Sequence, residues 1–111
     1  MRFEESKIGN VFIAKVLESR ITAEVASRFK QDLIKYLTKE DQTIVLDLSE
    51  VTFIDSSGLG AMIGSLKAIG NDRELVLCGA REAVFSMFKL TRMNKVFRIF
   101  HSREEAAAAL S

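Results

Sequence analysis

The strongest constraint on the fold is a nearly continuous apolar run at residues 43–48, Thr-Ile-Val-Leu-Asp-Leu. A strand with one buried face alternates apolar and polar residues, whereas a continuous run is typical of a strand covered on both faces. Such strands occur in parallel or mixed sheets that carry helices on both sides. The run therefore predicts a central strand of an α/β fold.

The rest of the chain alternates between strand and helix patterns. Residues 3–8 and 11–17 flank the turn dipeptide Gly9-Asn10, which predicts an antiparallel hairpin. A loop is expected at residues 18–21, with Thr22 as the N-cap of the first helix. The other expected segments are helices at 23–37, 57–69, 81–90 and from 103 onward, strands at 74–78 and 96–100, a short apolar segment at 51–54, and turns at 39–42 and 70–71. The predicted order is ββαβαβαβα, a mostly parallel mixed sheet with an N-terminal antiparallel hairpin and four helices.

Composition limits the class of protein. A chain of 111 residues, 48% hydrophobic and 28% charged, predicts one domain over residues 1–111. The 16 basic and 15 acidic residues nearly cancel, which argues against a nucleic-acid partner. The lone Cys78 suits a reducing cytoplasm, and no apolar run approaches the ~20 residues of a membrane span. We expect a cytoplasmic domain without membrane insertion.

Residue types give little support to catalysis. The spacing Gly58-x-Gly60-x-x-x-Gly64 resembles a dinucleotide-binding pattern only weakly, and Asp55 would place a negative charge where a pyrophosphate would sit. The single histidine, His101, has no visible partner that would orient it as a general base. No Cys/His/carboxylate cluster has metal-ligand spacing. We therefore predict no enzyme activity and no cofactor.

The stretch from Asp55 to Gly64 joins a strand end to a helix start. Ser56 lies at this joint, where a serine can cap the helix or present its hydroxyl at the surface as a chemical switch. The glycines and small residues of the following helix allow two uses as well. They permit close packing inside the domain, or they form a low-relief surface on which another protein docks.

Residues 51–60, Val-Thr-Phe-Ile-Asp-Ser-Ser-Gly-Leu-Gly, closely resemble the signature of the anti-sigma-factor antagonists, bacterial members of the STAS domain class. The resemblance extends to the strand at 44–48, the late turn and strand at 90–100 and the final helix at 102–108. It implies that Ser56 is phosphorylated by a partner serine kinase, which often doubles as an anti-sigma factor, and dephosphorylated by a serine phosphatase. The unmodified protein would bind the kinase and release what the kinase had sequestered.

The same resemblance implies a partner-binding surface around Ser56. Its expected members are Asp55, Ser57, Gly58, Leu59, Gly60, Ala61, Gly64, Arg20 and Thr22. The chain departs from the family in the loop 19–22, which usually reads Gly-x-Ile/Leu-Asp and here reads Ser-Arg-Ile-Thr. A basic Arg20 near Ser56 would be able to pair with a phosphate. The alternatives are a constitutive STAS scaffold or transport-complex subunit, which would not need the phospho-switch, and a small nucleotide-binding enzyme.

Overall fold

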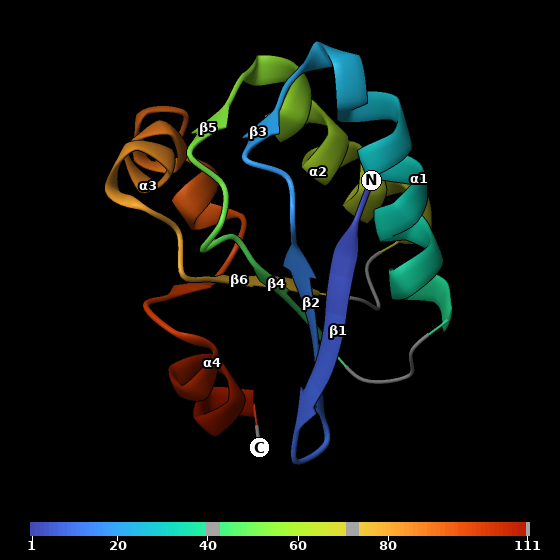
Figure 1. Cartoon of the computed structure of the whole chain (residues 1–111), viewed down its shortest axis with the longest axis vertical. Helices are drawn as coiled ribbons and strands as arrows, with labels where there is room; N and C mark the ends of the chain where they lie inside the picture. The colour runs from blue at the N-terminus through green and yellow to red at the C-terminus, as the bar shows by residue number, and fades with distance from the viewer. Residues whose placement is uncertain (40–42, 71–73, 111) are drawn as a thin grey trace.

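The computed structural model describes residues 1–39, 43–70 and 74–110. Its main sheet, within these residues, has five strands in the order β1-β2-β4-β6-β7 (Figure 1). The strands are β1 (Phe3–Ile8), β2 (Val11–Val16), β4 (Ile44–Asp47), β6 (Leu75–Cys78) and β7 (Ile99–Phe100). β1 and β2 form the predicted antiparallel hairpin, and every later pairing in this sheet is parallel. The expected α/β class and mixed sheet are confirmed.

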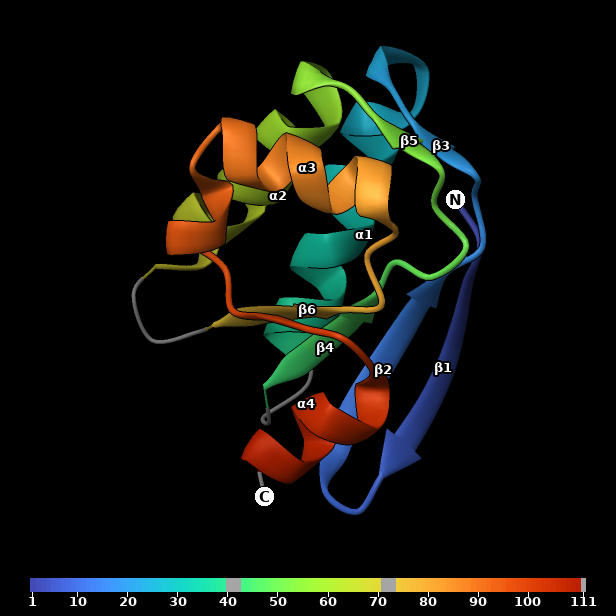
Figure 2. The same ribbon diagram turned by 90° about the vertical axis from the view of Figure 1, so that its left-hand side faces the viewer.

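Helices cover the sheet unequally. α1 (Ala23–Lys39), α2 (Ser56–Ile69) and α3 (Glu82–Leu90) lie on one face, whereas α4 (Arg103–Leu110) lies on the other (Figures 1 and 2). The buried residues of the central strands alternate between these two sides, with Ile44 and Leu46 in the larger cluster and Val45 in the smaller one. The continuous apolar run thus reflects a strand that is covered on both faces.

The polar residue of β4 binds helix α4. Asp47 is 4% exposed, and its carboxylate accepts hydrogen bonds from Arg103 at 2.6 and 3.1 Å and from the Ser49 amide at 2.9 Å. Arg103 also donates to the Ser6 hydroxyl at 3.1 Å, so the ion pair links α4 to two strands. Burial by itself would raise the pKa of Asp47, but the bonds from Arg103 and Ser49 outweigh it and the pKa is lowered.

The short segment before α2 does not belong to the main sheet. β5 (Phe53–Ile54) pairs in parallel with β3 (Arg20–Ile21) and forms a separate two-stranded sheet, so the loop predicted at 18–21 contains a strand. The Ser19 carbonyl accepts from the Thr52 amide at 2.7 Å and from the Thr52 hydroxyl at 3.0 Å, which fixes the register of this pair. A pair of two-residue strands leaves no periodic sequence signal.

Three other expectations need correction. The strand predicted at 96–100 is reduced to β7, because the 3₁₀ helix η1 (Met93–Lys95) precedes it and the amides of residues 96 and 97 both donate to the Met93 carbonyl. Residues 102–105, Ser-Arg-Glu-Glu, match a capping box in which Glu105 would accept from the Ser102 amide. The Ser102 hydroxyl does accept from the Glu105 amide at 3.1 Å, but the Glu105 carboxylate accepts from the His101 amide at 3.2 Å, one residue earlier than expected. Helix α2 begins at residue 56 instead of 57. The predicted turns at 39–42 and 70–71 lie largely outside the described residues.

Candidate functional site

Asp55 is the N-cap of α2. Its backbone is extended, with φ −102° and ψ −177°, and its side chain accepts a hydrogen bond from the Gly58 amide at 2.9 Å. This is the usual contact between a cap residue and the amide three positions on. Ser56 is the first residue of the helix, so the capping role that sequence reasoning left open for Ser56 belongs to its neighbour.

The Asp55 carboxylate also binds a second helix. Its other oxygen accepts from the amide of Ala23, the first residue of α1, at 3.2 Å. The Asp55 amide in turn donates to the Ile21 carbonyl at 3.2 Å, just before α1 begins. One acidic residue thus ties the N-terminal ends of α1 and α2 together, where both helix dipoles favour a negative charge. Figure 1 shows these two helix ends side by side, following β3 and β5.

Ser56 and Ser57 are exposed at the start of α2. The Ser56 hydroxyl makes no hydrogen bond within the part of the chain that the structure describes. It therefore has no structural task there, and a group attached to it would point into solvent beside the positive end of α2. This geometry allows chemical modification of Ser56 without disturbing the cap.

The small residues of α2 are used mainly for internal packing. Gly58 is buried, and a Cβ at this position would lie 2.6 Å from the Ile21 carbonyl oxygen. Ala61 is 6% exposed, and the Ser65 hydroxyl donates to the Ala61 carbonyl at 2.7 Å. Leu59 is 5% exposed and belongs to the core. Residues 58, 59 and 61 consequently shape the site from inside and offer little surface to a partner.

Other positions on α2 remain accessible. Gly60 is exposed, and a Cβ added there would meet nothing within 4 Å. Gly64 is half-buried, and a Cβ added there would lie 3.1 Å from the Lys30 side chain on the neighbouring helix α1. The low-relief surface predicted from the sequence is therefore accessible at Gly60, one turn after the two serines, and in part at Gly64 further along α2.

The β3–β5 pair adds a side chain that sequence reasoning missed. Phe53 is 39% exposed although it is large and apolar, and the Arg20 guanidinium lies over its ring at 4.4 Å. Arg20 and Phe53 are direct partners in the register of the two strands, and Phe53 lies three residues before Ser56 in the chain. Thr22 is half-buried at the start of α1. The only sequence signal for Phe53 was that a large apolar residue stands two positions before Asp55.

Other candidates for chemistry play no part at this site. Burial raises the pKa of the Cys78 thiol to about 12, so it stays protonated and behaves as a core residue. His101 is exposed beyond β7 and far along the chain from Ser56. Among the described residues, no group of three or more His, Cys, Asp or Glu side chains could hold a metal ion.

Comparisons with known proteins identify the family of this chain. The family model described as STAS domain matches residues 6–106. An anti-sigma-B factor antagonist from Listeria monocytogenes is 33% identical over 91 residues, which cover 81% of this chain and 76% of the relative. The chain belongs to the STAS domain family, in its anti-sigma-factor antagonist branch.

Solved structures place the STAS domain in the same group. The crystal structure of a Thermotoga maritima protein, described as a candidate anti-sigma factor antagonist, superposes with a TM-score of 0.82 at 27% identity, over 97% of this chain and 93% of that one. SpoIIAA of Bacillus in its phosphorylated form has a TM-score of 0.64 at 16% identity, over 99% and 100% of the two chains. The second likeness concerns the fold alone. Within the described residues, no helix of this STAS domain has the length and apolarity needed to cross a membrane.

Proposed function

We propose that this STAS domain is a regulatory phospho-switch protein, not an enzyme, which acts in a bacterial partner-switching pathway in the cytoplasm. Ser56 is the phosphoacceptor, and the unphosphorylated form binds a serine kinase that serves as an anti-sigma factor or sequesters another regulator. A serine phosphatase restores the binding form. The observation that carries the proposal is the exposed Ser56 hydroxyl, which is free because Asp55 alone caps the helix.

The switch follows from charge at a small surface. Phosphorylation adds about −1.5 to −2 charges to Ser56 at neutral pH, directly beside the Asp55 carboxylate. A partner seated on this surface would meet steric bulk and repulsion, and a loss of about 3 kcal/mol weakens binding more than a hundredfold. The Asp55 carboxylate keeps one hydrogen bond to each helix start, and a phosphate on Ser56 would point into solvent, so we expect the domain itself to remain folded.

The contact surface is formed by the accessible side chains around the phosphoacceptor. These are Arg20, Phe53, Ser56, Ser57 and Gly60, with contributions from the half-buried Thr22, Asp55 and Gly64. The stacked pair of Arg20 and Phe53 supplies an aromatic ring and an arginine, two residue types that are enriched at protein interfaces. Gly58, Leu59 and Ala61 contribute indirectly, by holding α2 against β3 and α1.

Phosphosite mapping tests the proposal. The protein is incubated with ATP and the serine kinase encoded in its own genome, and the modified residue is identified by mass spectrometry. Ser56→Ala should abolish modification, whereas the matched control Ser57→Ala, one position away and also exposed, should retain it. Full modification of Ser56→Ala would refute the assignment. If the protein co-purified stoichiometrically with a complex, and Ser56→Ala did not change that association, the protein would instead be a constitutive STAS scaffold or transport-complex subunit.

A further inference from the structure

A compact turn between α3 and β7 exposes two large apolar side chains. Leu90, the last residue of α3, is 83% exposed, and Val96, the residue after η1, is 53% exposed. Single exposed apolar residues are common on protein surfaces and need no explanation. Here, however, both lie within the eight residues 89–96, which also carry three cationic side chains. We call Lys89, Leu90, Arg92, Lys95 and Val96 the basic tip.

The basic tip stands on a rigid base. Beneath it, Phe88 and Phe97 are fully buried and pack edge to face with ring centroids 6.3 Å apart. The Thr91 hydroxyl donates to the Met87 carbonyl at 2.8 Å, which closes the end of α3. Backbone amides at 92, 95, 96 and 97 then donate to carbonyls three or four residues earlier, at 2.9 to 3.1 Å. The exposed side chains are therefore held outward by ordered backbone and are not carried on a loose loop.

The charge along the segment that carries the basic tip is one-sided. No acidic residue occurs between Glu82 and Glu104, although the chain as a whole has a formal charge of only +1. The cations of this segment that have acidic partners lie outside the tip: Arg98 pairs with Glu74, and Arg103 with Asp47.

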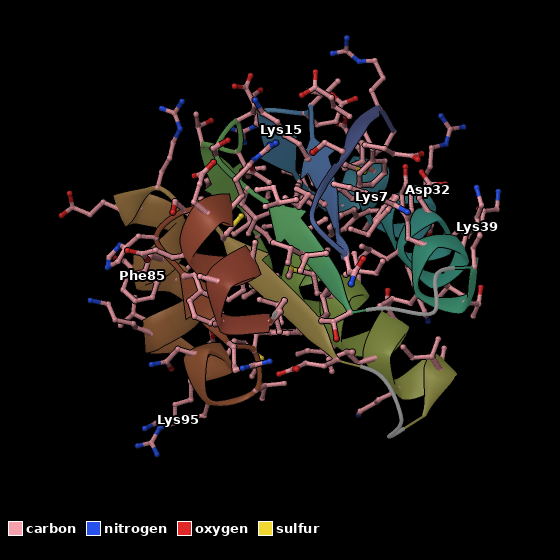
Figure 3. All side chains as sticks on the ribbon, turned by 90° about the horizontal axis from the view of Figure 1, so that it is seen from below. Lys7, Lys15, Asp32, Lys39, Phe85 and Lys95 are labelled. Atoms are coloured by element: carbon pink, nitrogen blue, oxygen red, sulfur yellow. The ribbon has the colours of Figure 1, made fainter. Side chains whose placement is uncertain are left out.

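Within the tip, the positive charges are not neutralised. Lys89 lies over the Phe85 ring at 5.0 Å, and Arg92 and Lys95 form no ion pair within the residues that the structure describes. Figure 3 shows Lys95 pointing outward at the edge of the molecule, on the same side as Phe85. The basic tip thus combines net positive charge with protruding apolar groups.

Arg92 occupies an unfavourable backbone conformation. Its φ is +61°, in the left-handed region that glycine or asparagine adopts more readily. Among the described residues it is the only one other than glycine with a positive φ. The turn therefore carries an arginine at a position where glycine would be favoured, which places a further cation between the two exposed apolar residues.

We propose that the basic tip adsorbs to anionic lipid headgroups, with Leu90 and Val96 inserted at the interface and Lys89, Arg92 and Lys95 on the headgroup phosphates. Cations near an anionic leaflet and apolar side chains in the interfacial layer are the two contributions that hold peripheral proteins on membranes. A protruding helix end fits a deformable lipid surface, whereas an acidic protein partner would need a matching hollow. The association is weak and reversible, requires no helix to cross the bilayer and does not depend on the state of Ser56.

Sedimentation with lipid vesicles tests this proposal on the intact protein. The probes are phosphatidylcholine vesicles with and without about 30% phosphatidylglycerol, at low ionic strength. The protein should bind the anionic vesicles and not the neutral ones. Each cation near the surface contributes about fivefold in affinity, so R92Q/K95Q should bind about 25-fold more weakly. Leu90→Ser, at an exposed position, should also weaken binding while the thermal unfolding midpoint stays unchanged.

The matched control is R28Q/K67Q, which removes two cations from exposed positions on α1 and α2. Its binding to the anionic vesicles should equal that of the wild type. Equal weakening by both double variants would show non-specific attraction by net charge and overturn the proposal. Absence of binding to anionic vesicles would overturn it too, and would leave an acidic protein as the partner of this surface. If Leu90→Ser bound the anionic vesicles with wild-type affinity, the proposed insertion of Leu90 would be contradicted.

Discussion

Replacing Asp55 by alanine removes one carboxylate from the starts of two helices. Oδ1 accepts from the Gly58 amide at 2.9 Å in α2, and Oδ2 accepts from the Ala23 amide at 3.2 Å in α1. Loss of a helix cap costs typically about 1 kcal/mol, so Asp55→Ala should lower the free energy of unfolding by about 2 kcal/mol. Asp55→Asn keeps a single acceptor oxygen and should lose about half as much.

Ser56 provides the matched comparison. It is adjacent to Asp55, exposed, and not engaged as a cap, so Ser56→Ala should change the free energy of unfolding by less than about 0.5 kcal/mol. Urea unfolding followed by far-ultraviolet circular dichroism measures all three variants, with an unchanged dependence on urea concentration as the check on two-state behaviour. Hydrogen exchange adds a local measurement: in Asp55→Ala the amides of Ala23 and Gly58 should lose protection together.

Two results would contradict the contacts assigned to Asp55 and Ser56. If Ser56→Ala destabilised the protein as much as Asp55→Ala, the serine would be a structural cap and its hydroxyl would not be free. If Asp55→Ala lowered protection at Gly58 and left Ala23 unchanged, the link between α1 and α2 would be wrong.

Three further predictions follow from the described contacts. The folded-state pKa of Asp47 lies below its unfolded value, so the stability that this carboxylate contributes is present above about pH 4 and is lost as pH falls through the folded pKa. Arg103→Ala leaves the buried carboxylate unpaired and should lower the free energy of unfolding by about 3–5 kcal/mol at pH 7, measured by urea unfolding. Gly58→Ala should destabilise the protein by about 1–3 kcal/mol, because its Cβ would lie 2.6 Å from a backbone oxygen of β3, whereas Gly60→Ala, with open space around it, should stabilise α2 by up to about 1 kcal/mol; equal signs for the two variants would contradict the packing. Cys78, whose thiol pKa burial raises to about 12, should resist a thiol reagent at pH 8 in the native state and react after unfolding.

Much of the fold could be predicted from the sequence because its elements are long enough to show periodicity. The apolar stripe of α1, the doubly buried strand at 44–47 and the hairpin around Gly9 each extend over several residues with one dominant pattern. The elements that were not predicted correctly are too short to show periodicity. β3 and β5 have two residues each, and the predicted strand at 96–100 was displaced by a 3₁₀ turn that buries Phe97 against α3.

Only part of the candidate site could be predicted, because several of its contacts join residues that lie far apart in the chain. The motif located Ser56 at a helix start, but which residue caps the helix depends on a one-residue difference in where α2 begins. The bond from Asp55 to α1 joins positions 32 residues apart, and the stacking of Arg20 on Phe53 requires the β3–β5 register. Contacts of this kind are set by tertiary structure, so local sequence patterns do not contain them.

The affinity of the partner kinase for the two forms of the protein tests the phospho-switch most directly. Isothermal titration compares the unmodified domain with the same domain phosphorylated on Ser56, with Ser56→Asp as a stable substitute and Ser57→Asp as the position control. The proposed mechanism predicts binding weakened more than a hundredfold by phosphorylation of Ser56, at unchanged thermal stability of the domain. Equal affinity of the unmodified and phosphorylated forms would contradict it.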